Sequence, residues 1–359
     1  MSELGDDSAD KVESCREPFN CSMLPIKHCP SPFSASQVVE YLQAINFQPL
    51  PVWRAESEWV DFKPNLETLE KLMRLHIIAF PYENTEDHYT AKGRICWKEQ
   101  DVFKRLVTEK KGYGTVCFGH GFFFRGILRA LGYRAIATAT RNNAIWNTSL
   151  GTPALTPIGH TILLATVPGH KIPFLVDVGF GGIHNLSLLS KPVPLIAGAI
   201  TGSFTPPEEY RLIPGDNTES SLEPNPCAPC GWWLHARHST TAPWRTISYF
   251  TLEEYTDKDF EYFVYSMVTM PNGPGHTKLF CIKVVKGPSG ILERYAVAGK
   301  FATKQVGCGE KVVIETFKSE HERIDAIRRL CGIQLDVADA LKHMAKRKIA
   351  LPIQESSRL

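Results

Sequence analysis

The hydrophobic period of the chain changes at Gly132, and this change limits the folds that are open to it. Before Gly132, apolar residues recur at the i, i+3, i+4, i+7 spacing of amphipathic helices in four segments: residues 34–47, 65–80, 100–110 and 118–131. After it come β-rich runs bounded by Pro, Gly and Asn: residues 133–141, 160–167, 172–180, 209–213, 232–238, 278–285 and 293–299. Helical patterns return at residues 319–333 and 337–351. Helices and strands that occur in separate blocks predict an α+β fold.

The overall charge and the termini restrict the class of protein. Residues 1–34 are polar and without a period, so we expect a flexible extension, followed by a helical bundle over residues 35–132. Since 40 Lys and Arg oppose 38 Asp and Glu, no global field favours nucleic acid or a membrane as partner. The apolar runs are far shorter than the roughly 18 residues of a membrane span. With no apolar signal core and ten irregularly spaced cysteines, we expect a cytoplasmic protein with reduced thiols.

Cys117 stands at the boundary between a glycine-rich turn and an apolar helix. Gly112 and Gly114 permit the turn, and the run from Phe118 forms the helix. A helix N-terminus lowers the pKa of a thiol and offers free N–H groups to an oxyanion. Cysteines flanked by apolar residues are more often simply buried. The position alone therefore leaves both interpretations open.

Two later residues favour catalysis. His160 opens a β-rich run, and Asp177 lies between Val176 and Val178, where a carboxylate needs a polar partner. The short loop between the two runs predicts a hairpin, which would make His160 and Asp177 cross-strand neighbours. They would supply a base and the group that fixes its tautomer, as a cysteine nucleophile requires.

At these residues the chain resembles the arylamine N-acetyltransferases, and its long loops and N-terminal extension resemble fungal members of that family. "HIIAFPYENTEDH" is similar to the His-x-x-x-x-Pro-Phe-Glu-Asn segment of that family, and "KKGYGTVCF" falls where the family has Arg-Gly-Gly-x-Cys. "GHTILLATV" and "FLVDVGFGG" resemble the His and Asp motifs in order and spacing, and "ERIDAIRRLCGIQL" resembles the C-terminal helix. The similarity runs from about residue 35 to 335.

The resemblance implies a helical bundle, a central antiparallel β-barrel over residues 133–245 and an α/β lid over residues 246–359, around a cysteine-proteinase-like core. It implies a Cys117, His160 and Asp177 triad that takes an acyl group from acetyl-CoA, or another short acyl-CoA, by a ping-pong mechanism. A small aromatic amine or hydrazine would accept the group, in the detoxification of xenobiotics, without a metal. The residues implied to contact the acceptor are Phe180, Gly159 and Phe80, and those implied to contact coenzyme A are Thr269 and Gly275.

The chain departs from the family pattern beside the nucleophile. Gly119 and Gly121 stand where the family usually has Glu and Asn, and two glycines in the first turn would loosen the helix. Gly182 stands where many relatives carry a larger side chain, which predicts a roomier acceptor pocket.

Several alternatives stay open. The acyl donor could be malonyl- or propionyl-CoA, or the chain could bind acyl-CoA with low activity. A thiol protease or a transglutaminase uses the same order of Cys, His and Asp. Cys227, Cys230, His235 and His238 are spaced too closely for an ordinary zinc site. His120 and His170 are predicted at the surface or in loops, and the basic run "KHMAKRK" on a solvated helix face.

Overall fold

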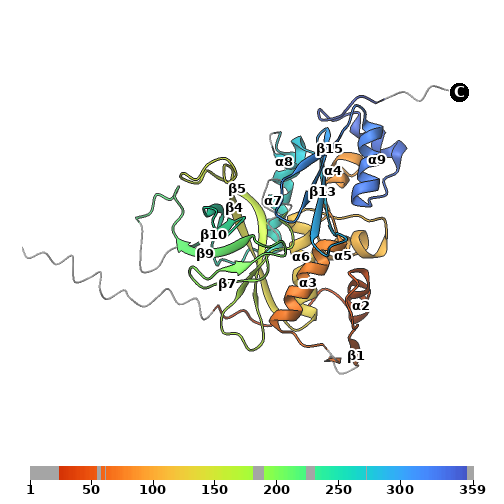
Figure 1. Ribbon diagram of the computed structural model, residues 1–359. Helices are drawn as coiled ribbons and strands as arrows, with labels where there is room; N and C mark the ends of the chain where they lie inside the picture. The colour runs from red at the N-terminus through yellow and green to blue at the C-terminus, as the bar shows by residue number, and fades with distance from the viewer. Residues whose placement is uncertain are drawn as a thin grey trace, which may run out of the picture.

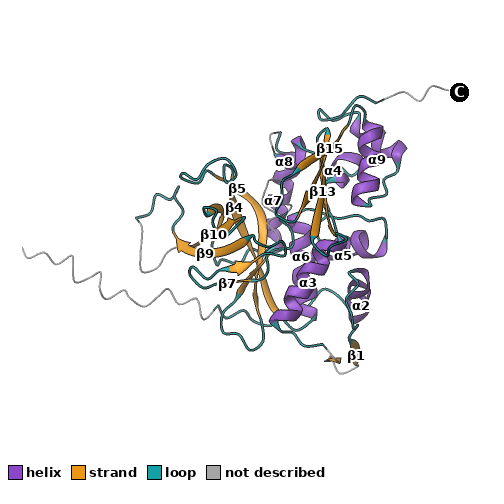
Figure 2. Ribbon diagram, in the orientation of Figure 1, coloured by secondary structure: helices purple, strands orange, loops and turns teal. Residues whose placement is uncertain are grey.

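The computed structural model describes residues 24–353, except 55–57, 61, 181–189, 224–230 and 272. Figure 1 shows a large sheet at the left, helices beside it in the lower centre, and a second sheet with α9 at the upper right. Figure 2 shows that helices also lie between the two sheets. The first 23 residues of the predicted extension lie outside the described residues.

The helices of the first 132 residues form where the apolar period predicts them. Ser34 caps the first helix through a capping box with Gln37. The helix predicted over residues 100–110 consists of two parts, since a short α-helix is followed directly by a single turn of π-helix. The bounds are α2 Ala35–Ala44, α3 Leu66–Ala79, α4 Thr85–Tyr89, α5 Glu99–Phe103, η2 Lys104–Thr108 and α6 Cys117–Ala130.

The large sheet has eight antiparallel strands and is almost closed into a barrel. Its order is β7-β6-β5-β4-β11-β10-β9-β8, and bridges Ser190–Ser203 and Ala197–Leu212 join its two ends. The predicted run 172–180 is a strand only over Phe174–Val176, so Asp177 lies just beyond the strand. The bounds are β4 Arg134–Asn143, β5 Leu155–Thr166, β6 Phe174–Val176, β7 Val193–Pro194, β8 Thr201–Gly202, β9 Glu209–Gly215, β10 Gly231–Arg237 and β11 Arg245–Phe250.

The second sheet joins the two ends of the chain. Its order is β15-β14-β13-β12-β3, and β3 (Tyr82–Glu83) comes from the N-terminal helical region. The apolar pattern did not predict this two-residue strand. The C-terminal bounds are α7 Asp257–Thr269, α8 Pro274–Thr277, β12 Phe280–Lys286, β13 Leu292–Ala298, β14 Phe301–Val306, β15 Val312–Thr316, α9 Glu320–Cys331 and α10 Val337–Met344. A separate hairpin pairs β1 (Val52–Arg54) with β2 (Glu58–Val60).

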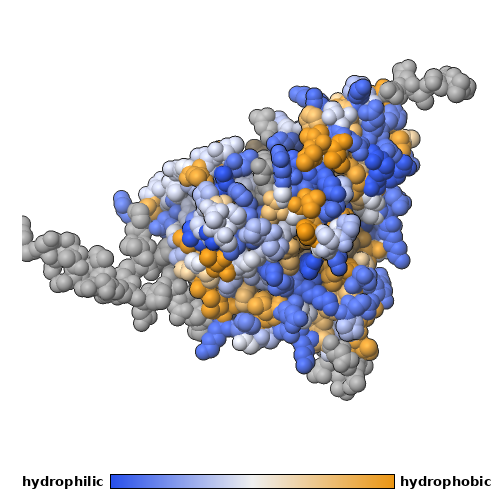
Figure 3. All heavy atoms as spheres, viewed as in Figure 1, coloured by the Kyte–Doolittle hydropathy of each residue, from blue (hydrophilic) through white to orange (hydrophobic). Residues whose placement is uncertain are grey.

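Helix α6 lies at the centre of the molecule. Each residue from Cys117 to Leu128 is buried, and α6 contacts α5, β4 and β5. A helix that is apolar on all sides belongs in a core. The apolar side chains visible in Figure 3 include a group over the region of β15, where Val312, Val313 and Ile314 are exposed. None of the helices described is long and apolar enough to span a bilayer.

Candidate active site

Cys117 is the first residue of α6, as the sequence predicts. Its side chain is only 2% exposed, and its Sγ lies 3.8 Å from the carbonyl oxygen of Gly159. Val116, the N-cap residue, makes no side-chain hydrogen bond to the first turn of α6, whose N–H groups lie beside the sulfur. Those N–H groups could stabilise an oxyanion next to Cys117.

The hairpin of β5 and β6 brings His160 and Asp177 together. Leu163 pairs with Val176, and His160 Nε2 lies 2.7 Å from Asp177 Oδ2. The other carboxylate oxygen accepts the Gly179 N–H at 2.8 Å. A Cβ on Gly179 would lie 2.8 Å from the Cα of Cys117, so the loop after Asp177 approaches the nucleophile through a residue that must be glycine. The predicted cross-strand meeting of a base and a carboxylate is therefore present in the structure.

The environment favours a protonated His160. Burial lowers its pKa, but the charge and hydrogen bond of Asp177, with a smaller effect of Cys117, outweigh burial and raise the pKa to about 10. Because Nε2 faces Asp177, Nδ1 is the nitrogen left to exchange a proton with Cys117. At neutral pH the site can hold an imidazolium beside the sulfur.

The two unusual glycines of α6 are required by close contacts. A Cβ on Gly119 would lie 2.4 Å from Thr115 Oγ1 and 3.0 Å from the carbonyl oxygen of Cys96. A Cβ on Gly121 would lie 2.8 Å from the Thr161 methyl carbon. Helix α6 runs from Cys117 through both positions without interruption, so the expected loosening of its first turn is not seen. Thr115 also stands where the family motif has glycine, so its side chain fills space beside Gly119.

A buried ion pair holds the turn before Cys117. Arg105 Nη2 donates to Glu83 Oε1 at 2.8 Å, and Arg105 Nε donates to the Gly114 carbonyl at 2.9 Å. Glu83 also accepts the Gly114 N–H at 3.1 Å. The guanidinium lies 4.2 Å from the centre of the Tyr113 ring. The pair of Arg105 and Glu83 therefore connects η2 and β3 to residues 111–116, the segment before Cys117 that is called the nucleophile turn below.

The three residues predicted to contact the acceptor have different surroundings. The Phe180 ring meets the His160 ring edge to face, with centroids 4.9 Å apart. Gly159 contributes the carbonyl beside Cys117. Phe80 is buried in the bundle, where its ring contacts include Tyr41 and His76, and the ring contacts of the described residues do not join it to the triad. Gly182 lies outside the described residues.

The predicted coenzyme A residues lie near a basic cavity. Thr269 is exposed at the end of α7, whereas Gly275 is buried and its carbonyl accepts from Asn84 Nδ2 at 3.4 Å. A cavity of about 480 Å³ opens beside this segment; its lining includes Pro271, His276, Thr277, Lys346, Arg347 and Lys348. The basic run predicted on a solvated face therefore also borders a cavity.

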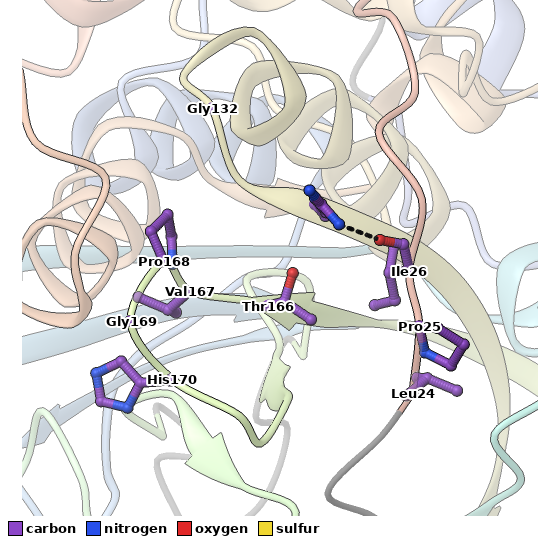
Figure 4. A pocket seen from close by; sticks show the side chains of 10 residues that line it. Leu24, Pro25, Ile26, Gly132, Thr166, Val167, Pro168, Gly169 and His170 are labelled. Carbon is purple, nitrogen blue, oxygen red and sulfur yellow. Dashed lines mark hydrogen bonds between the residues drawn. The ribbon is translucent and has the colours of Figure 1, made fainter.

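A second cavity contains none of the predicted site residues. It has a volume of about 360 Å³ and lies between residues 24–26 and the ends of β4 and β5. Figure 4 shows Ile26 on one side of it and the Pro168–His170 turn on the other. The bond drawn there joins Arg134 to the Ile26 carbonyl at 3.3 Å.

The histidine predictions are partly wrong. His170 is exposed in a turn, but His120 is buried in α6, because this helix is enclosed on all sides. His235 lies in β10, and Cys227 and Cys230 lie outside the described residues. No cluster of metal-binding side chains occurs in the ranges that the structure covers.

The sequence analysis missed Arg105 and Tyr82. Both residues could have been found from departures from the family motifs. Tyr113 stands in place of the motif arginine, and Tyr82 stands in place of the motif phenylalanine. The first replacement coincides with a guanidinium supplied by Arg105 from η2.

Comparisons with known proteins agree with this fold. A sequence profile described as N-acetyltransferase matches residues 65–340. An N-malonyltransferase of Fusarium pseudograminearum is 26% identical, over 85% of this chain and 91% of that protein. The arylamine N-acetyltransferase structure from Mycobacterium smegmatis covers 86% of this chain and 94% of its own, with a TM-score of 0.64 and 24% identity. A Mycobacterium marinum arylamine N-acetyltransferase in complex with CoA gives a TM-score of 0.61 at 24% identity, over 84% of this chain and 94% of its own. The match decides against a thiol protease or a transglutaminase, and the chain belongs to the N-acetyltransferase family of acyltransferases that includes the arylamine N-acetyltransferases.

Proposed function

We propose that the protein transfers a short acyl group from coenzyme A to an arylamine or arylhydrazine through a thioester on Cys117. The observation that carries the proposal is the 2.7 Å bond between His160 and Asp177 at the loop that contacts Cys117. A cysteine at a helix N-terminus beside a protonated histidine is suited to attack a thioester.

The first half of the reaction acylates Cys117. The sulfur attacks the thioester carbonyl carbon, the carbonyl oxygen takes the negative charge, and N–H groups of α6 stabilise it. The carbon–sulfur bond to coenzyme A then breaks, and His160 gives its proton to the leaving thiolate. Asp177 keeps the imidazole oriented through both steps. Free coenzyme A leaves.

The second half transfers the acyl group to nitrogen. The amine attacks the thioester carbonyl, the bond to Cys117 breaks, and His160 takes the proton that the nitrogen loses. The Phe180 ring, which meets His160 edge to face, would form one wall of the acceptor site. Gly159 would border the same space through its carbonyl.

Coenzyme A would bind along the segment from Asp259 to His276, near Thr269. The basic cavity supports this region, because Lys346 and Lys348 border it and phosphate groups favour cationic surroundings. We expect Lys348→Ala to raise the KM for acyl-CoA and to leave the KM for the arylamine unchanged. An unchanged KM for acyl-CoA would remove this cavity from the proposal.

Intact-mass spectrometry after incubation with acetyl-CoA tests the reaction. We expect one acetyl adduct on the wild-type chain and none on Cys117→Ala, and an arylamine should discharge the adduct. Cys96→Ala is the matched control, because burial raises the pKa of the Cys96 thiol to about 12 and this thiol should not react. An adduct that persists in Cys117→Ala would refute the assignment.

The same assay, repeated with different acyl-CoA thioesters, identifies the preferred acyl donor. The similarity to a fungal N-malonyltransferase across most of both chains favours malonyl-CoA as an alternative to acetyl- and propionyl-CoA. The donor with the highest kcat/KM for adduct formation is the preferred one. If none of the three donors forms an adduct, the proposed transferase activity is wrong and a binding role remains.

A further inference from the structure

Tyr82 lies directly beside the nucleophile turn. Its strand β3 pairs with Ile282 of β12 on one side and forms a bridge with Thr115 on the other. The Glu83 N–H donates to the Thr115 carbonyl at 3.0 Å. Residues 82–83 and 114–115 therefore run side by side, and Cys117 follows two residues after the bridge.

The ring of Tyr82 is fixed between two other rings. It stacks on Phe280 with a centroid distance of 5.2 Å and an angle of 10°, and on His120 at 6.4 Å and 20°. The ring is half-buried, and its two stacking partners, Phe280 and His120, are buried and hold its orientation. The hydroxyl proton can change direction by rotation about the carbon–oxygen bond.

A buried hydrogen-bonded chain holds His120 in one protonation state. His120 Nε2 lies 3.1 Å from the Pro81 carbonyl, which can only accept, so this nitrogen carries the proton. His120 Nδ1 then accepts from His76 Nε2 at 2.9 Å, and His76 Nδ1 accepts from the Tyr41 hydroxyl at 3.2 Å. Burial lowers the pKa of His120 to about 4 and that of His76 well below its usual value. Both rings stay neutral and support Tyr82 without adding a charge.

The strand bridge to Thr115 and the stacking on His120 place the Tyr82 ring beside the first turn of α6. Burial, then the negative charges of Cys117 and Asp177 and a hydrogen bond to the Cys117 side chain, raise the pKa of Tyr82 well above its usual value, whereas a hydrogen bond with the Cys117 backbone lowers it. The hydroxyl therefore keeps its proton at the pH at which the reaction runs, and it can serve only as a neutral donor or acceptor.

We propose that the Tyr82 hydroxyl donates a hydrogen bond to the reacting centre, first to the Cys117 sulfur and then to the oxygen of the thioester carbonyl. This inference rests on the proposed function. As the new carbon–sulfur bond forms, negative charge moves from the sulfur to the carbonyl oxygen, and the hydroxyl turns to follow it. The proton stays on Tyr82 throughout, so no bond to hydrogen is broken. The family motif has phenylalanine here, so this donor is a feature of the present chain.

The test compares Tyr82→Phe with wild type in two assays. We expect the rate constant for adduct formation with saturating acetyl-CoA to fall by about hundredfold to thousandfold, as for the loss of a donor to an oxyanion. We expect the pH profile of Cys117 alkylation by iodoacetamide to move to higher pH, because the charged sulfur loses a donor. The matched control is Tyr133→Phe, which removes a tyrosine hydroxyl that donates to the Asn65 carbonyl. This control should change neither measurement.

The outcomes separate the two proposals. Unchanged acylation and alkylation in a folded Tyr82→Phe chain would overturn the role of Tyr82. If wild type itself forms no adduct with any acyl-CoA, the transferase proposal fails, whereas the alkylation profiles still report on Tyr82 and the sulfur. Should Tyr82→Phe fail to fold, 3-fluorotyrosine at position 82 retains the ring and makes the hydroxyl a stronger donor. An alkylation profile that does not move to lower pH would then refute the contact.

Discussion

Replacement of Gly119 by alanine should destabilise the protein, although alanine is the better helix former. A Cβ at this position would lie 2.4 Å from Thr115 Oγ1 and 2.5 Å from Thr115 Cγ2, distances that cannot persist without movement. Overpacking of this kind costs about 1–3 kcal/mol. The helix propensity of alanine returns about 0.5–1 kcal/mol. We expect a net loss of about 0.5–2 kcal/mol in the free energy of unfolding.

A double-mutant cycle with Thr115→Ala isolates the contact. Thr115→Ala alone should cost about 1–2 kcal/mol, through the lost methyl group and the lost 2.9 Å hydrogen bond to the Cys96 carbonyl. In the double variant the two Thr115 atoms are absent and only the 3.0 Å approach to the Cys96 carbonyl oxygen remains, so Gly119→Ala should destabilise much less. The coupling should reach about 1 kcal/mol or more in favour of the double variant.

Urea unfolding measures these free energies, and adduct formation with acetyl-CoA measures their effect on Cys117. Gly119→Ala should also slow adduct formation, because the displaced turn carries the nucleophile. Gly202→Ala is the matched control, since a Cβ there would have no neighbour within 4 Å. Additive losses in the cycle, or a Gly119→Ala variant as stable as wild type, would show that the close approach to Thr115 is not what requires glycine.

Three further perturbations test the surroundings of the site. Asp177→Asn should bring the NMR titration midpoint of His160 from about 10 to below its ordinary 6.5, because burial then dominates; a midpoint that stays near 10 would contradict this cause. Because the pKa of His160 is raised in the folded protein, its contact with Asp177 stabilises the fold fully below about pH 6.5, and this stabilisation is lost as pH rises through about 10. The difference in the free energy of unfolding between wild type and Asp177→Asn should therefore be largest in acid. Arg105→Met should cost about 3–5 kcal/mol in urea unfolding by leaving Glu83 buried without its cation, whereas a loss below 1 kcal/mol would mean that the pair is dispensable. Gly121→Ala would place a Cβ 2.8 Å from a methyl carbon of β5, and we expect a lower melting temperature; an unchanged one would show that β5 yields freely.

The sequence predicted the contact between His160 and Asp177 because its signals are local. Cys117 follows a turn, and His160 and Asp177 belong to one hairpin whose short loop fixes the pairing. The surface prediction for His120 failed because it considered the residue alone. The phenylalanines that follow it already indicate a helix enclosed on all sides.

Contacts that join distant parts of the chain were not predictable. Strand β3 has two residues, and its partner β12 begins 198 residues after Tyr82, so no periodic pattern reveals the pairing. Glycine is needed at position 119 because the Thr115 side chain lies beside it, and helix propensities take no account of such neighbours. Likewise, Arg105 reaches Glu83 only because η2 and β3 meet in the fold.

Because a chain is synthesised from its N-terminus, the contacts of the nucleophile turn with much later residues determine when the thiol site can form. The nucleophile turn is bonded to the last third of the chain, since the Gln334 N–H donates to the Lys111 carbonyl at 2.9 Å and the Tyr113 hydroxyl donates to the Gln334 carbonyl at 3.2 Å. Domains that emerge first from a ribosome usually fold first. Here the part that carries Cys117 emerges early but lacks its neighbours until residue 334 has followed. A ribosome-bound chain should therefore hold an unfinished thiol site, and catalytic competence should arrive only after residue 334 has left the ribosome.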